Sequence, residues 1–135
     1  MFKPLSRMLV SAFLASVSIS VGEPSLTEST IFTNAVAGYP VFRIPAIVRA
    51  NDGTLLAFCE GRSSTADGGD IDLVLKRSSD NGLTWGPLIL VHEEGGSAPI
   101  TIGNPAPVVD RSTGHLHLLF CRENDTVFHT VSTDN

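Results

Sequence analysis

Positively charged residues are scarce in this sequence: 9 Lys and Arg stand against 14 Asp and Glu in 135 residues, a formal net charge of -5. A nucleic-acid binder needs a concentrated basic face for the backbone phosphates, so that class of function is excluded. Low-complexity runs are few, and 42% of the residues are hydrophobic. The chain can therefore bury enough apolar surface to offset the entropy of ordering, and its length suits one modest domain.

A long apolar span is missing as well. The uncharged stretch from Met8 to Val21 is diluted by serine and falls short of the roughly 18 to 20 apolar residues that cross a bilayer. It follows Lys3 and Arg7 and leads to small residues around Gly22, which is the pattern of a secretory signal peptide. We predict that residues 1–22 are cleaved. Residues 23–135 would then be secreted and extracellular, or lumenal (lysosomal) in a eukaryote, without stable membrane insertion.

Cysteine is sparse, with two residues in the chain. Cys59 and Cys121 lie in similar contexts, LLAFCEGR and HLLFCREN. They could form a disulfide between neighbouring strands in an oxidising compartment, or each could be a small buried hydrophobe. In an exported eukaryotic protein Asn124 could also be glycosylated, because it begins an Asn-Asp-Thr sequon.

Amphipathic segments of helix length are absent after the leader. Short runs rich in Val, Ile, Leu, Phe and Thr recur instead, separated by Gly, Asn, Asp or Pro at the spacing of about 8 to 12 residues that is typical of all-β folds. Turns are expected at Asn51-Asp52-Gly53, Asn81-Gly82 and Thr113-Gly114. The predicted strands are Phe42–Ala50, Thr54–Glu60, Ile71–Ser79, Leu88–His92, Ala106–Asp110, His115–Arg122 and Thr126–Ser132.

An internal repeat refines this prediction. Pro45-Ala46, Gly53 and Phe58-Cys59 recur as Pro105-Ala106, Gly114 and Phe120-Cys121, at offsets of 60, 61 and 62 residues. One sheet of about four strands per repeat at this period is typical of a β-propeller blade. About two blades are present, whereas a closed propeller has at least four. We therefore expect residues 23–135 to be the N-terminal part of a longer, truncated propeller domain.

A turn motif supports the propeller interpretation. Ser78-x-Asp80-x-Gly82-x-Thr84-Trp85 matches the Asp box, S-x-D-x-G-x-T-W, at every defined position. The Ser and Asp side chains can bond the backbone of the turn, and Trp85 can pack beneath it. The motif is therefore a marker of fold, without an expected catalytic role.

The residues before this turn carry a family resemblance. Phe42-Arg43-Ile44-Pro45 places an arginine at the head of an apolar strand, where a guanidinium is avoided unless it reaches a rim or an anion. The run from Asp52 to Arg62, then Asp67, then the Asp box follow in order. Over residues 42–135 this set resembles the exo-α-sialidases, or neuraminidases, whose N-terminal region carries (F/Y)RIP, DG-x-LLAF-x-EGR, a catalytic Asp and the first Asp box, or BNR repeat. The resemblance implies a six-bladed β-propeller.

The resemblance also implies roles for four residues. Arg43 matches the first arginine of the triad that grips the sialic acid carboxylate, a task that suits a planar guanidinium. Asp67 matches the general acid/base, which protonates the leaving glycosidic oxygen and later activates water, and whose pKa the site would have to raise. Arg62 and Asn104 match residues that line the same pocket.

The residues alone leave alternatives open at this site. The stretch GRSSTADGGDID is the most polar of the sequence, so Arg62 and Asp67 could belong to a solvated loop. Asp70 and Asp72 compete with Asp67 for the acid role, and only the spacing from the EGR element favours Asp67. His115 and His117 share a strand face but have no third metal ligand at suitable spacing. The resemblance implies no metal and no cofactor.

The expected function is hydrolysis of terminal sialic acid linkages in glycoproteins, glycolipids and oligosaccharides. The family also uses a tyrosine nucleophile paired with a glutamate, and two more arginines complete its carboxylate clamp. The one tyrosine here, Tyr39, precedes the RIP motif. We therefore expect the 135-residue chain to be inactive alone. The alternatives are a propeller that binds carbohydrate or protein without catalysis, and a trans-sialidase.

Overall fold

The computed structural model describes residues 25–134, and the predicted signal peptide at residues 1–22 lies outside them. Among the described residues there is no α-helix, and so no helix that could cross a membrane. All seven predicted strands are confirmed, and the largest difference is that the fifth begins at Ile102 instead of Ala106. The strands are β1 Val41–Arg49, β2 Leu55–Arg62, β3 Ile71–Ser78, β4 Ile89–His92, β5 Ile102–Val109, β6 Leu116–Arg122 and β7 Thr126–Ser132.

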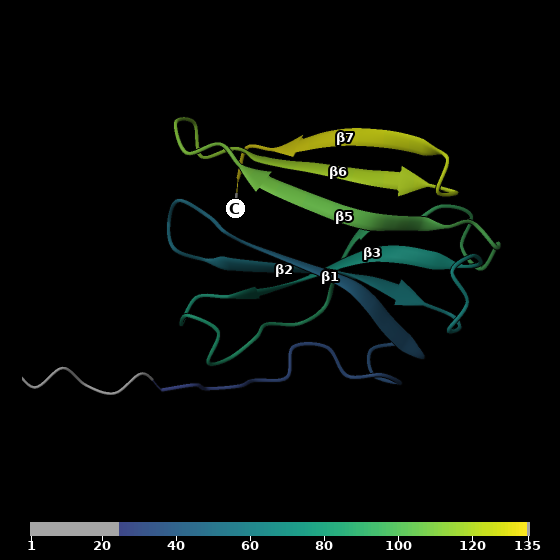
Figure 1. Ribbon diagram of the computed structural model, residues 1–135, viewed down its shortest axis with the longest axis horizontal. Coiled ribbons are helices and arrows are strands. Elements are labelled where there is room, and N and C mark those ends of the chain that lie inside the picture. The colour runs from purple at the N-terminus through teal and green to yellow at the C-terminus, as the bar shows by residue number, and fades with distance from the viewer. Residues whose placement is uncertain (1–24, 135) are drawn as a thin grey trace, which may run out of the picture.

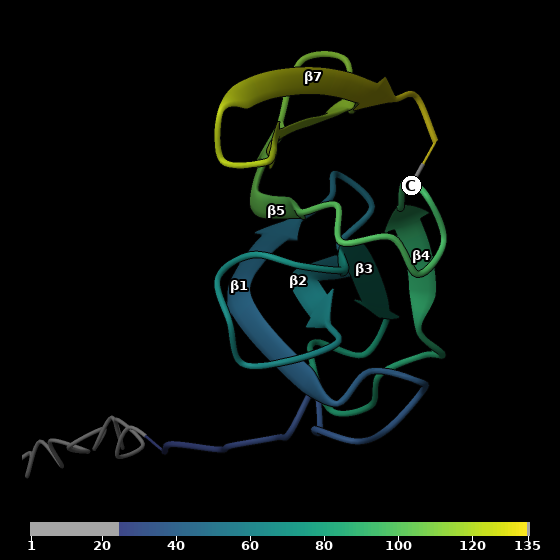
Figure 2. The ribbon, with the colours of Figure 1, turned by 90° about the vertical axis from the view of Figure 1, so that its right-hand side faces the viewer.

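The strands form two antiparallel sheets that stack on each other (Figure 1), with the orders β1-β2-β3-β4 and β5-β6-β7. Figure 2 shows β7 at the edge of the second sheet, on the side away from β1–β4. Within each sheet, every strand pairs with its neighbours in sequence. Gly53 and Gly114 supply the positive φ that two of the predicted turns require, at 95° and 81°.

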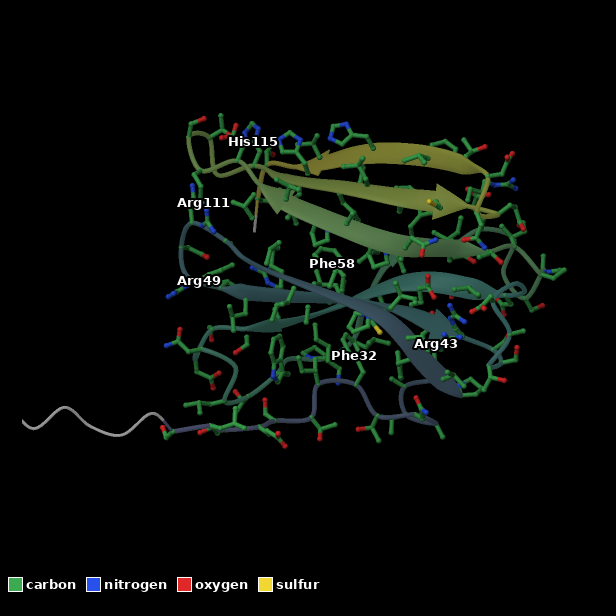
Figure 3. All side chains as sticks on the ribbon, in the orientation of Figure 1. Phe32, Arg43, Arg49, Phe58, Arg111 and His115 are labelled. Atoms are coloured by element: carbon green, nitrogen blue, oxygen red, sulfur yellow. The ribbon has the colours of Figure 1, made fainter. Side chains whose placement is uncertain are left out.

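The hydrophobic core lies between the two sheets. Figure 3 shows Phe58 of β2 in this layer, where the residue is 2% exposed. From the second sheet, alternate residues of β6 point inward, as the period of two along a strand requires. The buried members of the core are Ala50, Leu56, Phe58, Leu73, Ile102, Leu116, Leu118 and Phe120.

The sequence repeat is also a structural repeat. A β-bulge shifts the register of β1 against β2 between Arg43 and Ala46, and an equivalent bulge shifts β5 against β6 between Gly103 and Ala106. In each bulge the residue before the proline has a left-handed backbone, with φ 55° at Ile44 and φ 56° at Asn104. This conformation is uncommon for non-glycine residues, so its recurrence at equivalent positions confirms that the two sheets are copies of one unit.

Two further contacts join the sheets. At one end, Ile71 and Thr101 form a parallel bridge, and the Ile71 N–H donates to the Ile100 carbonyl at 3.1 Å. At the other end, the Asn51 side-chain amide donates to the Arg111 carbonyl at 3.1 Å. These polar contacts fix the ends of the two sheets relative to each other, while the apolar core fills the space between.

The two cysteines are not bridged. Cys59 lies on β2 and Cys121 on β6, in different sheets, and both are free thiols. The expectation of a disulfide between neighbouring strands is therefore wrong, and Cys59 takes the other alternative, a small buried residue. Its thiol donates to the Arg43 carbonyl at 3.0 Å, and burial raises its pKa to about 11. Cys59 thus supports the β1 bulge as a protonated thiol.

Candidate functional site

The predicted site residues meet at one end of the two sheets. Arg43 pairs with Glu60 in the β1–β2 ladder, so the start of β1 lies beside the end of β2, and the loop of residues 63–70 continues from there. The start of β5 and the β6–β7 turn reach the same end. Figure 3 shows Arg43 at this end and Arg49 and Arg111 at the opposite one.

Asp67 is held by two arginines. Its Oδ1 accepts hydrogen bonds from Arg43 Nη1 at 2.8 Å and from Arg62 Nη1 at 3.0 Å. The two cations differ in exposure, since the Arg43 side chain is 44% exposed and the Arg62 side chain only 4%. The Asp67 side chain is 80% exposed, so a ligand in solvent can reach both Asp67 and Arg43.

The charge state of Asp67 differs from the sequence-based expectation. The hydrogen bond from Arg62, and then the charge of Arg43, lower the pKa of Asp67 below its ordinary value. We expected the site to raise this pKa, as a general acid requires. The expectation is wrong for this structure because both arginines stabilise the carboxylate and its exposed position brings little desolvation.

Asn104 reaches the same site from the second sheet. Its backbone N–H donates to Glu60 Oε1 at 2.8 Å, and its side-chain amide donates to Asn124 Oδ1 at 2.9 Å. Asn124 lies in the β6–β7 turn, where Glu123 and Asn124 both have φ 55°. The Asn124 amide nitrogen, which a glycan would modify, faces the Asp67 carbonyl at 3.4 Å. The sequon therefore points toward the site, and a glycan there would replace this contact.

The competing acids, Asp70 and Asp72, occupy different environments. Asp72 Oδ2 accepts a hydrogen bond from the Tyr39 hydroxyl at 2.6 Å, and burial raises the pKa of Asp72. The Asp70 carbonyl accepts from the Ser63 N–H at 3.0 Å and thereby closes the base of the loop. Of the three carboxylates, Asp67 is the one that ion-pairs with Arg43 and Arg62.

Sequence reasoning missed Glu60 as a site residue. The Glu60 side chain is 3% exposed, and its Oε2 accepts a hydrogen bond from Arg62 Nε at 2.7 Å and ion-pairs with Arg62 Nη2 at 2.5 Å. A signal was present, because Glu60 and Arg62 are two apart on one strand and therefore share a face. A carboxylate inside an apolar strand, two positions from an arginine, indicates a buried ion pair. Tyr39 was also missed, since its partner Asp72 is 33 residues away.

The turn of the Asp box has the expected hydrogen bonds. The Gly82 N–H donates to Ser78 Oγ at 2.9 Å, and the Thr84 N–H donates to Asp80 Oδ1 at 2.9 Å. Asn81 and Gly82 supply the positive φ, at 58° and 88°. The turn lies beyond β3, whereas the residues of the candidate site gather at the start of β1 and the end of β2. Its contacts stabilise the turn, as the motif predicted.

The histidines do not join this site. His117 Nδ1 and His129 Nε2 lie 3.0 Å apart on β6 and β7, and the partner of His117 is thus a histidine of the neighbouring strand. Within residues 25–134, no group of three or more His, Cys, Asp or Glu side chains is arranged to hold a metal ion.

Comparison with known proteins places these observations in a family. No family model matches the chain. The chain is 47% identical over 88 residues to an exo-alpha-sialidase of Arthroderma benhamiae, covering 60% of this chain and 21% of that protein. It is 40% identical over 95 residues to a sialidase of Micromonospora viridifaciens, covering 69% and 15%. A solved structure, the Hadza microbial sialidase Hz136, matches with a TM-score of 0.56 and 30% identity over 61% of this chain and 17% of that one.

Repeated antiparallel sheets with matching bulges, superposable on a sialidase, define this chain as part of a β-propeller. The chain belongs to the sialidase family. It spans about a fifth of the length of the curated relatives it matches, so the activity of a whole sialidase is a separate question from family membership.

Proposed function

We propose that this chain supplies the carboxylate-binding and acid/base part of an exo-α-sialidase, a glycoside hydrolase that releases terminal sialic acid from glycoproteins, glycolipids and oligosaccharides. The observation that carries the proposal is the meeting of Arg43, Arg62, Asp67 and Asn104 at one end of the sheets. These residues come from both copies of the repeat, and fold stability alone does not require an exposed arginine and an exposed aspartate there.

In this proposal Arg43 binds the carboxylate of sialic acid. Its guanidinium is exposed and already binds a carboxylate, that of Asp67. A substrate carboxylate can replace Asp67 on Arg43 through two parallel N–H···O bonds. The buried Arg62 keeps Asp67 at the rim, and the Asn104 side chain lines the site.

Asp67 then acts as acid and base. When the substrate takes Arg43, Asp67 loses one of the two cations that lower its pKa and gains a negative neighbour, so its pKa rises. A protonated Asp67 gives its proton to the leaving glycosidic oxygen, and the resulting carboxylate later takes a proton from the attacking water. The low pKa without substrate and the acid role are thus compatible.

One observation favours a second candidate, a module that binds sialylated glycans without catalysis. Arg62 and Arg43 lower the pKa of Asp67, and a carboxyl group whose pKa stays low with ligand bound cannot act as a general acid. The two candidates differ in what ligand binding does. A catalytic site raises the pKa of Asp67 on binding, whereas in a binding module Asp67 stays paired and its pKa stays low.

The first test is binding of N-acetylneuraminic acid to the 135-residue chain, followed by NMR. We expect Arg43→Ala to weaken binding at least tenfold, since it removes the exposed guanidinium. Arg49→Ala is the matched control, because Arg49 is an exposed arginine of the same strand at the opposite end (Figure 3). Equal effects of the two variants, or no binding by the unmodified chain, would refute the proposed site.

The same titration separates the candidates. The pKa of Asp67, read from its side-chain carbon shift, should rise when the ligand is saturating if the site is catalytic. An unchanged pKa with ligand bound supports the binding module. No turnover of a fluorogenic sialoside is expected from this chain alone, since its one tyrosine, Tyr39, donates its hydroxyl to Asp72, whereas the hydrogen-bond partners of the Asp67 carboxylate are Arg43 and Arg62.

We also propose that residues 1–22 direct export. The chain expressed with its leader should be recovered from the medium with an N-terminus close to residue 23, as determined by N-terminal sequencing. Recovery inside the cell with Met1 retained would contradict this proposal.

A further inference from the structure

Glu60 stands at the centre of the candidate site without reaching its surface. Its side chain is 3% exposed, and both carboxylate oxygens are used. Oε2 accepts a hydrogen bond from Arg62 Nε and ion-pairs with Arg62 Nη2, and Oε1 accepts a hydrogen bond from the Asn104 N–H. A buried carboxylate without partners is costly, so these contacts must form together.

The contact with Asn104 joins the two copies of the repeat. Glu60 lies on β2 of the first sheet, and Asn104 lies in the β5 bulge of the second. Gly103 makes room for the carboxylate, because a Cβ at this position would overlap Glu60 Oε1. The left-handed backbone of Asn104 turns its N–H toward Glu60 and its side chain toward Asn124. Glu60 therefore fixes the point from which Asn104 enters the site.

The contact of Glu60 with Arg62 affects the charge that Arg62 presents to Asp67. The guanidinium of Arg62 is shared between Glu60, through Nε and Nη2, and Asp67, through Nη1. The charged groups that act on Asp67 are Arg62 on β2 and Arg43 on β1. Because Glu60 Oε2 ion-pairs with the buried guanidinium of Arg62, it offsets part of the charge that Arg62 presents to Asp67.

We propose that Glu60 is a positioning residue of this site: it fixes the Arg62 guanidinium and the Asn104 main chain across the sheet boundary and offsets the charge of Arg62 beside Asp67. The inference rests on the proposed function in giving Asp67 the acid/base role. Its consequence is that Arg43, and not Arg62, is the cation that an anionic substrate withdraws from Asp67, and that the acid strength of Asp67 depends on a residue it does not touch.

The test is the pKa of Asp67 in Glu60→Gln, measured by NMR on the 135-residue chain. The substitution keeps the shape of the side chain but removes its charge, so Arg62 acts on Asp67 with its full charge. We expect the pKa of Asp67 to fall below its value in the unmodified chain, and the Asn104 amide signal to move. If Glu60 only maintained structure, Arg62 would loosen and the pKa of Asp67 would rise toward its ordinary value.

Glu94→Gln is the matched control. Glu94 Oε2 also pairs with an arginine, Arg122 Nε at 2.6 Å, and the cations that pair with Asp67 are Arg43 and Arg62 instead. It should leave the pKa of Asp67 and the Asn104 signal unchanged. An unchanged or raised Asp67 pKa in folded Glu60→Gln would overturn the proposal, as would an equal effect of Glu94→Gln.

Glu60→Gln leaves a buried arginine short of its partner and can prevent folding. The double variant Glu60→Gln/Arg62→Gln then decides. In the double variant the Asp67 pKa rises because Arg62 is lost, so the Asn104 amide signal is the deciding measurement. Refolding with a displaced Asn104 signal supports the positioning role, whereas an Asn104 signal in its original place, or failure of both variants to fold, rejects it. The titration uses no sialoside, so its failure and the failure of the sialic acid binding test are independent results.

Discussion

At the scale of single residues, the structure uses carboxylates in two ways. Asp80 and Asp67 both have lowered pKa values, but from different causes: hydroxyl and backbone donors of a turn for Asp80, and guanidinium groups for Asp67. The first arrangement is local, within four residues, and could be expected from the motif. The second depends on a side chain 24 residues away. Local donors stabilise a turn, whereas distant cations prepare a site that a ligand can change.

The Asp80 carboxyl gives a prediction of pH dependence. The Thr84 hydroxyl, the Thr84 N–H and the Ser78 hydroxyl lower its pKa to about 2. A lowered pKa means that the turn is stabilised at pH values above the ordinary value of about 3.9 and loses this stabilisation as the pH falls through about 2. NMR titration should give about 2 for the unmodified chain and a higher value for Thr84→Val, which lacks the hydroxyl. An ordinary Asp80 pKa in the unmodified chain would contradict the hydrogen bonds of the turn.

At the scale of elements, the two bulged strands are the informative pair. β1 and β5 have the same register shift and the same left-handed residue before proline, but Ile44 is β-branched whereas Asn104 tolerates this backbone. The strain at Ile44 lies directly after Arg43, whose exposed side chain the bulge presents. Strain of this kind is typical of functional positions, so the bulge in β1 serves the site at some cost in stability.

Exchanging the two residues tests that strain. Ile44→Asn should raise the free energy of unfolding by roughly 1 kcal/mol, because asparagine fits the left-handed backbone. Asn104→Ile should lower it by about 1 to 3 kcal/mol, since it adds strain and removes the bond to Asn124. Ile47→Asn is the control, an exposed position of the same strand outside the bulge, and should not stabilise. Urea denaturation measures all three, and stabilisation by Ile47→Asn as well would show that the effect is unrelated to the bulge.

The contact between β2 and the segment before β1 gives a third prediction. A Cβ at Gly61 would lie 2.7 Å from Cδ1 of the Tyr39 ring, so Gly61→Ala should displace the ring from Asp72. Burial and the bond to Asp72 raise the pKa of Tyr39 above its ordinary value of about 10, and stability therefore falls as the pH rises past that value. Because Tyr39 is the one tyrosine, ultraviolet titration reports on it alone. The pKa should fall in Gly61→Ala, and an unchanged titration curve would show that the ring stays in place.

At the scale of the whole molecule, stability comes from the layer between the sheets. Phe58 fills this layer and is 2% exposed, whereas Leu83 in the Asp-box turn is 72% exposed. The outer face of the second sheet carries exposed apolar residues, among them Val108, Val127 and Val131. Cooperative unfolding should therefore depend on the one shared core, and not on either sheet alone.

Substitution in this core gives the last prediction. Phe58→Ala should lower the free energy of unfolding by about 3 to 5 kcal/mol, because it removes a buried ring and leaves a cavity. Leu83→Ala should change it by less than about 0.5 kcal/mol. Urea denaturation followed by Trp85 fluorescence measures both. A similar, small effect of the two variants would mean that the layer between the sheets does not control folding.

The strands and the repeat could be predicted from sequence because their signals are local. Short apolar runs, the glycines of the turns and the repeat of the sequence motifs located all seven strands to within a few residues. Arg43, Arg62, Asp67 and Asn104 were found through the family resemblance, and the structure brings them together. Tyr39 was missed because its partner Asp72 is 33 residues away. For Glu60 the nearby partner Arg62 was a usable signal, and only the contact with Asn104, 44 residues away, could not be predicted. The pKa of Asp67 was predicted wrongly since it depends on where two guanidinium groups lie, which no spacing specifies.

The bulges have a consequence for how repeated units diverge. Arg43 and Gly103 occupy equivalent positions of the two copies, one with a long side chain and the other with none. Arg43 of the first copy extends its side chain into solvent, and Gly103 of the second copy, which has no side chain, leaves room for the Glu60 carboxylate. The two copies therefore differ at this position in a way that suits each to its own place, and the β1 and β5 sequences can no longer replace each other. If the β1 sequence replaced that of β5, an arginine would stand at position 103. Its side chain would overlap the Glu60 carboxylate, which joins the two sheets through Asn104.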